Sequence, residues 1–166
     1  MEKTFHLKDN GIMIWKKPHI SKIYEALTVI ADCRMEINGN KAKCYLSSSD
    51  KYYDVKYDPN IGGIMSNDNA AYYTYSLSYP MIAFLMLIGK IPYEQKLLEI
   101  LQNICWEDIN KKFKNDYDKS IKLVLGELKS EGEDVDFIRR EIDKIYNFVC
   151  KIEIKTLGKL ERPPKK

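Results

Sequence analysis

The sequence predicts an α+β fold, in which a small antiparallel β-meander packs on two helices and is followed by a C-terminal helical bundle. Two observations carry this prediction. Between residues 33 and 57, apolar and polar residues alternate and short turn-forming clusters interrupt them, as in strands joined by tight turns. From residue 93 onward, apolar residues recur every three or four positions, which is typical of helices that pack along one face.

The composition is that of a soluble protein with a substantial core. Of the 166 residues, 45% are hydrophobic and 31% are charged. The longest apolar run, Met81–Ile88, is far shorter than the roughly 20 residues that cross a bilayer, and the first residues lack the apolar segment of a secretory signal. The four cysteines lie far apart, which is typical of buried, reduced thiols. We therefore expect a cytoplasmic protein that does not engage a membrane.

The N-terminal segment is expected to form a hairpin and then a helix. The β-prone segments Thr4–Leu7 and Ile12–Trp15 flank an Asn10-Gly11 pair, and Asn-Gly favours the tight type I′ turn of a hairpin. Pro18 is placed to open a helix that reaches Asp32, because proline is tolerated in the first helical turn. The apolar residues that share one face of this helix are Ile20, Ile23, Tyr24, Leu27, Ile30 and Ala31.

Three strands are expected next, with one face buried on the first helix. The turns between them are predicted at Asn38-Gly39-Asn40 and at Ser47–Asp50. A fourth, short strand is expected at Ile64-Met65, after a loop that contains two glycines. The residues that alternate with charged or polar ones along these strands are Met35 and Ile37, then Ala42, Cys44 and Leu46, then Tyr53, Val55 and Tyr57.

The stretch Ser66–Pro92 joins the strand-rich part to the helical part. Its second half is predicted to be a central apolar helix, which Pro80 starts and Gly89 ends. We divide the chain into a mixed α+β part (1–91), a helical part packed on it (92–157) and a basic flexible tail (158–166).

Several helices are predicted in residues 92–157. One helical stripe covers 97–113, with a bend near Trp106, and a second covers 117–128. Asp134 is placed to cap the last helix. That helix carries a short apolar seam, long enough for docking on other helices or for a dimer contact: Val135, Ile138, Ile142, Ile145 and Val149.

Patterns that would indicate cofactor or metal chemistry are missing from the sequence. There are two histidines, His6 and His19, and neither lies near a cysteine pair, whereas a structural zinc site needs four grouped ligands. No P-loop, dinucleotide fingerprint or nucleophile elbow occurs. We expect no cofactor, no metal and no catalytic residues.

The order of elements from Lys41 to Leu87 resembles the ββα layout of SWIM-type zinc modules. Those modules place a Cys-x-Cys pair after the second strand and a Cys-x-His pair at the start of the helix. Here the corresponding places hold Ser66-Asn67-Asp68 and Ser78-Tyr79-Pro80, so none of the four ligand places holds the cysteine or histidine of those modules. The resemblance implies a metal-less binding module related to nucleic-acid or protein interaction domains, and no site residue is carried over from it.

A cluster of tyrosines with nearby lysines is the clearest interaction signal. Tyrosine buries a ring while its hydroxyl stays in water, which suits an interface or a base-stacking platform. We therefore expect a non-catalytic binding module that engages nucleic acid or a protein partner through a Tyr/Lys-rich face. Packing of these tyrosines in the core is the competing interpretation. The expected binding residues are Lys43, Lys51, Tyr53, Asn67, Asp68, Tyr72, Tyr73, Tyr75 and Tyr79.

Two other functions stay open. One is a small enzyme with a polar pocket around Asn67 and Asp68, although Asn and Asp in a turn commonly just satisfy its backbone. The other is an oligomeric assembly subunit that uses its C-terminal helices.

Overall fold

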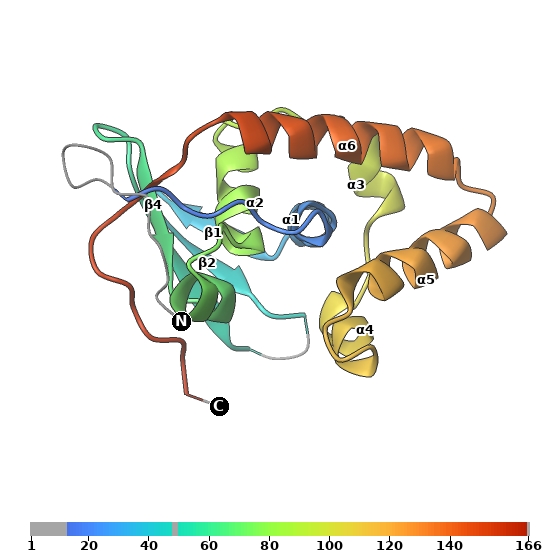
Figure 1. Cartoon of the computed structure of the whole chain (residues 1–166), viewed down its shortest axis with the longest axis horizontal. Coiled ribbons are helices and arrows are strands. Elements are labelled where there is room, and N and C mark those ends of the chain that lie inside the picture. The colour runs from blue at the N-terminus through green and yellow to red at the C-terminus, as the bar shows by residue number, and fades with distance from the viewer. Residues whose placement is uncertain (1–12, 48–49, 166) are drawn as a thin grey trace.

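The α+β fold is confirmed by a computed structural model, which describes residues 13–47 and 50–165. Within these residues, one five-stranded sheet has the strand order β1-β2-β3-β4-β5. Helix α2 lies directly on the inner face of this sheet, and helix α1 lies between α2 and the C-terminal helices, so the molecule is built in successive layers (Figure 1). The predicted boundary near residue 91 stays a prediction.

The predicted meander is confirmed. Strands β1 (Met35–Asn38), β2 (Lys41–Tyr45), β3 (Tyr52–Asp58) and β4 (Gly63–Ser66) pair in antiparallel order. Cys44 lies opposite Tyr53 and Ala42 opposite Val55, so these four side chains share the inner face. A fifth strand that we did not predict, β5 (Lys155–Thr156), pairs in parallel with β4.

The two helices predicted beside the meander are also present, but the sheet rests on the second of them rather than on the first as expected, because α2 contacts β3 and β4 while α1 packs on α2. Helix α1 spans Ser21–Ala31, and helix α2 spans Tyr79–Leu87. Every residue of α2 from Pro80 to Met86 is buried, as expected for a helix that is apolar on all sides. The chain leaves α2 through Gly89, whose φ of +81° is a conformation that residues with a Cβ rarely adopt.

The C-terminal helices are α3 (Lys96–Ile100), α4 (Trp106–Lys112), α5 (Tyr117–Ser130) and α6 (Val135–Lys151). The bend predicted near Trp106 is a full break between α3 and α4. Asp134 caps α6 as predicted, because its side chain accepts a hydrogen bond from the Phe137 amide at 3.0 Å. No helix in the described ranges is long and apolar enough to cross a membrane.

The apolar seam of α6 is buried inside this chain. Ile138, Ile142, Ile145 and Val149 belong to the core, and α6 packs on both α1 and α5. The seam on which an oligomer was considered is therefore already covered by the chain's own helices.

The N-terminal described segment lies beside two later parts of the chain, the segment before α2 and the segment after α6. The first strand of the expected N-terminal hairpin, Thr4–Leu7, lies outside the described residues. Ile14 pairs with Lys155, and Lys16 pairs with Ser76. The C-terminal segment continues past the edge of the sheet (Figure 1), where Lys56 forms an ion pair with Glu161 at 2.6 Å. The flexibility expected for residues 158–166 stays a prediction.

The prediction of buried cysteines is correct for Cys44 and wrong for Cys33, which is exposed. Cys33 follows the end of α1 and has a φ of +54°. Its position at this turn, rather than on the apolar stripe of α1, explains its exposure.

Candidate functional site

The outward-facing side chains of β2 and β3 form a surface that we call the outer Tyr/Lys face: Lys41, Lys43, Tyr45, Tyr52 and Lys56. Strand register creates it, because Tyr45 lies opposite Tyr52 and Lys41 lies opposite Lys56. Since neighbouring strands place opposed residues on the same side of a sheet, these side chains point away from α2.

Two tyrosines and a lysine form the centre of this face. The ring centroids of Tyr45 and Tyr52 are 5.5 Å apart, and the Lys43 ammonium lies 4.8 Å from the centroid of the Tyr52 ring. The second distance fits a cation–π contact. Tyr52 is 36% exposed, so one side of the aromatic pair stays open to solvent.

Acidic residues balance part of the positive charge on the face. Asp54 lies opposite Lys43, and the Tyr45 hydroxyl donates to Glu36 at 3.1 Å. Lys41 and Lys56 are like charges in opposed positions, an arrangement that destabilises a sheet unless a counter-charge is near. Glu161 supplies that counter-charge to Lys56. Lys41 and Lys43 are therefore the lysines through which this face would attract an anion.

Two tyrosines that we expected at a binding surface point into the protein instead. Tyr53 lies opposite Cys44 on the inner face and is half-buried, and burial raises its pKa to about 12. Tyr79 begins α2, and burial raises the pKa of its hydroxyl well above 10. For these two residues, the packing interpretation describes the arrangement better than the binding interpretation.

Asn67 and Asp68 satisfy backbone groups at the end of β4. The Asn67 side-chain oxygen accepts from the Asp54 amide at 2.8 Å. Asp68 is only 3% exposed, and it accepts from the Ala71 amide at 2.9 Å and from the Ser78 hydroxyl. Burial raises the pKa of Asp68, and the hydrogen bond from Ser78 acts against that rise. Asp68 therefore holds the start of the next helix in place, and its carboxylate is enclosed.

The helix that Asp68 holds is a short π-helix, η1 (Ala70–Thr74), which we did not predict. It carries Tyr72 and Tyr73, whose rings meet edge-on at 4.9 Å. Tyr73 is 59% exposed, and the Tyr72 hydroxyl accepts a hydrogen bond from Arg162 at 3.2 Å. Tyr75 ends the helix with a φ of +54°.

The sequence-predicted residues thus fall into separate groups. Lys43 lies on the outer Tyr/Lys face, and Lys51 is exposed just before β3. Tyr72 and Tyr73 form a second aromatic surface on η1. The segment that leads into η1 is held near β3, because the Asn67 side chain accepts a hydrogen bond from the Asp54 amide. Tyr45 and Tyr52, which complete the outer face, were absent from the expected binding residues.

A buried polar group that joins α1 to α4 also escaped prediction. Glu25 pairs with Lys22 at 2.7 Å and accepts from the Asn110 amide at 3.2 Å. Burial raises the pKa of Glu25, and Lys22 acts against that rise. Thr28 accepts a hydrogen bond from the Trp106 indole at 2.9 Å. These contacts fasten α4 to the core, and their residues are too far apart in sequence to be paired by pattern.

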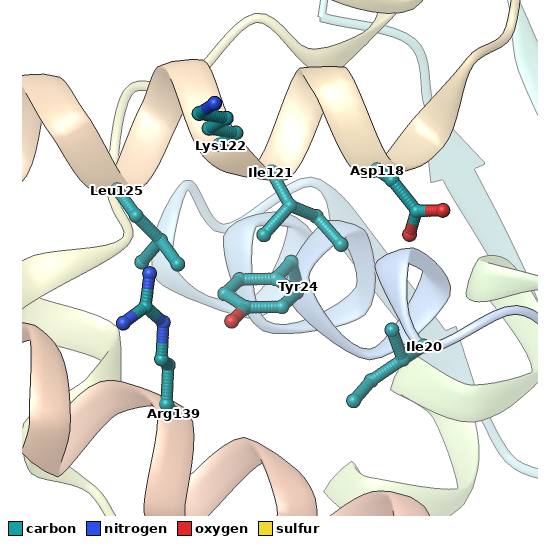
Figure 2. Close-up of a pocket in the computed structure, with 7 residues that line it drawn as sticks. All are labelled: Ile20, Tyr24, Asp118, Ile121, Lys122, Leu125 and Arg139. Carbon is teal, nitrogen blue, oxygen red and sulfur yellow. The ribbon is translucent and has the colours of Figure 1, made fainter.

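A groove of about 400 Å³ lies between α1, α5 and α6, and we call it the α1–α5–α6 groove (Figure 2). Its lining residues are Ile20, Tyr24, Asp118, Ile121, Lys122, Leu125 and Arg139. A second hollow of about 430 Å³ continues toward the turn between α5 and α6 and shares Lys122, Leu125 and Arg139 with the first.

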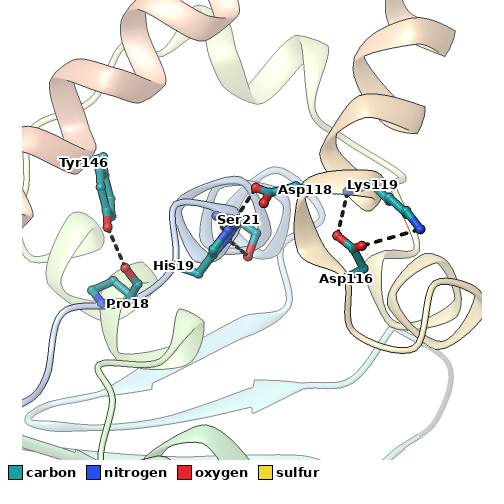
Figure 3. Close-up of polar contacts among 7 residues, drawn as sticks. All are labelled: Pro18, His19, Ser21, Asp116, Asp118, Lys119 and Tyr146. Carbon is teal, nitrogen blue, oxygen red and sulfur yellow. Dashed lines mark hydrogen bonds and ion pairs between the residues drawn. The ribbon is translucent and has the colours of Figure 1, made fainter.

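His19 connects the start of α1 to α5 (Figure 3). One ring nitrogen lies 3.1 Å from the Asp118 carboxylate, and the other lies 3.0 Å from the Ser21 hydroxyl. This serine–histidine–aspartate order is found in nucleophilic catalysis. Here, however, Ser21 is 1% exposed and its own backbone amide donates to His19 at 3.0 Å. The histidine thus caps α1 and ties it to α5, and the serine is closed to a substrate.

Metal ligands do not gather in the described part of the chain, where no group of three or more His, Cys, Asp or Glu side chains is close enough to hold an ion. Comparison with curated proteins and with solved structures gives no match. The family model described as Uncharacterised conserved protein UCP014422 matches residues 15–155, which include all the helices and strands described above except the last residue of β5. The chain belongs to the family of Uncharacterised conserved protein UCP014422.

Proposed function

We propose that this protein is a non-catalytic binding module that engages single-stranded nucleic acid through its outer Tyr/Lys face. The observation that carries the proposal is the partly exposed Tyr45–Tyr52 pair with Lys43 beside it. Aromatic rings on an open sheet stack with bases, and neighbouring lysines attract the phosphates between them. The mild net charge of +3 fits a small site rather than a long electrostatic track.

A binding role is favoured over catalysis by the position of the acidic residues. Asp68, the carboxylate on which an enzyme was considered, is enclosed and bonded to Ala71 and Ser78. Enzymes act through polar groups that converge on an accessible pocket. The two hollows on the helical side are lined by other residues.

The test is the binding of a fluorescein-labelled oligo(dT) and a labelled oligo(U), followed by anisotropy at low salt. Stacking contributes about 1–3 kcal/mol per base when a ring is cut to alanine, which corresponds to roughly 5–150-fold in affinity. We expect Tyr52→Ala to weaken binding by that amount and Tyr52→Phe, which keeps the ring, to retain it. Lys43→Gln should weaken binding and reduce its salt dependence, whereas Lys90→Gln, in the loop after α2, is the matched control.

A protein partner is the second candidate, because β1 lies at the edge of the sheet. Its Ile37 is 40% exposed, and edge strands add a strand from another chain through backbone hydrogen bonds. If neither oligonucleotide binds at low salt, the nucleic-acid proposal fails. Ile37→Lys would then be the variant that separates a β1 partner from any other, and sizing chromatography would show whether that partner is a second copy.

A further inference from the structure

The α1–α5–α6 groove combines an apolar floor with cations at the end where it meets the second hollow. Ile20, Ile121 and Leu125 supply the floor, and Arg139 reaches from α6 toward Leu125 and Tyr24 (Figure 2). Lys122 lines the same groove from α5. A volume of about 400 Å³ is within the range in which proteins hold small ligands.

The polar groups of the groove have unused hydrogen-bonding capacity. In the part of the chain that the structure describes, neither Arg139 nor Lys122 forms an ion pair or a side-chain hydrogen bond, and the Tyr24 hydroxyl has no hydrogen-bond partner. The groove's own acid, Asp118, is instead occupied by His19 at 3.1 Å. A guanidinium and a phenol hydroxyl beside an apolar floor match the head of a carboxylate ligand.

We propose that this groove binds a small amphiphilic carboxylate, with its apolar body on Ile20, Ile121 and Leu125 and its carboxylate between Arg139 and Tyr24. Burial raises the pKa of Tyr24 to about 12, Arg139 acts against that rise and Asp143 adds to it, and the hydroxyl is a donor at neutral pH. Arginine presents paired N–H donors that fit the two oxygens of a carboxylate.

Charge also fixes the direction in which the ligand lies. Glu133, Asp134 and Asp136 line the hollow near the α5–α6 turn together with Lys129, and because the acids outnumber this lysine they repel a carboxylate placed at that end. The head therefore sits at Arg139, where the groove meets the second hollow, and the apolar body extends toward α1. This inference is independent of the outer Tyr/Lys face, which lies on the sheet.

Titration calorimetry of the full-length chain with decanoate tests the proposal, with decanol as the uncharged probe. We expect saturable binding of one decanoate per chain and at least tenfold weaker binding of decanol, because the alcohol lacks the charge-assisted hydrogen bonds. Arg139→Gln should weaken decanoate binding about tenfold or more. Arg140→Gln is the matched control, since Arg140 is the next residue of α6 and lies over the Phe137 ring instead.

The outcomes decide the matter directly. Absence of saturable decanoate binding in the millimolar range overturns the proposal, and so does equal binding of decanoate and decanol. Equal losses in the Arg139 and Arg140 variants would show that the effect is general charge, which also overturns it. Both arginines are exposed, so the variants are expected to fold, and circular dichroism verifies this. Decanoate binding does not depend on the outer Tyr/Lys face, so failure of the oligonucleotide test would not affect the outcome of this one.

Discussion

Replacing Asp68 with alanine should destabilise the fold far more than replacing it with asparagine. Alanine leaves two buried donors, the Ala71 amide and the Ser78 hydroxyl, without their acceptor. Each unsatisfied buried donor costs about 1–3 kcal/mol, so with two of them we expect Asp68→Ala to lower the free energy of unfolding by about 2–6 kcal/mol. Asparagine still accepts from Ala71 and can donate to the Ser78 oxygen, so its cost should stay within about 1 kcal/mol.

The effect of pH gives this prediction a second, independent readout. Because the pKa of Asp68 is raised by burial, the folded state binds its proton more tightly than the unfolded state does. The stabilisation from this proton is complete below the ordinary pKa of 3.8 and is lost as pH rises through the raised folded-state value. Asp68→Asn removes this pH dependence. The free energy of unfolding of the Asn variant, relative to that of the wild type, should therefore be higher at pH 8 than at pH 4.

Urea unfolding at pH 4, 6 and 8 measures both effects. If the slope of the unfolding free energy against urea concentration is the same in all variants, unfolding exposes a similar surface in each of them. The reasoning is refuted if Asp68→Ala costs less than about 1 kcal/mol, or if Asp68→Asn and the wild type keep a constant difference across this pH range. The first outcome would mean that the carboxylate is not a required acceptor, and the second would mean that it is not a buried acid; either would reopen the enzyme interpretation.

Five further substitutions test the fold, each by its change in the free energy of urea unfolding. Gly126→Ala, inside α5 with open space around it, should stabilise by about 0.5–1 kcal/mol, whereas Gly89→Ala, at φ +81°, should destabilise by about 1–2 kcal/mol; the same sign for both would contradict the backbone argument. Asp134→Ala should cost about 0.5–2 kcal/mol through the lost cap of α6, more than Asp136→Ala in the first turn, which loses only a dipole interaction. Phe84→Ala, fully buried in α2, should cost about 3–5 kcal/mol, and a cost below 1 kcal/mol would show that α2 is not the centre of the core.

Local patterns explain how much of this fold could be predicted from the sequence. Alternation with short turns identified β1 to β3, and the apolar run between Pro80 and Gly89 identified α2. In each case the buried residues lie close together in the sequence, so their pattern is visible there. Strand β5 could not be found, since two residues carry no period and their pairing depends on β4, which lies about ninety residues earlier. The π-helix was missed because it is a single element of five residues, too short to show a period, and such helices are rare.

The candidate site shows a signal that was present in the sequence and was not used. Val55 belongs to the inner face, and a strand alternates, so Tyr53 must point inward and Tyr52 outward. Counting from Val55 would therefore have selected Tyr52 rather than Tyr53 as a surface residue. The α1–α5–α6 groove is different, because it depends on how three helices are placed in space, and no local pattern reports that placement.

The most direct measurement for the central claim is the low-salt affinity of labelled oligo(dT) and oligo(U) for the wild type and for Tyr52→Ala and Tyr52→Phe. The outer Tyr/Lys face predicts binding that weakens with added salt, is lost by roughly 5–150-fold in Tyr52→Ala, and survives in Tyr52→Phe. Absence of binding at low salt, or equal affinities in all three proteins, would contradict the proposal that this face is a base-stacking surface.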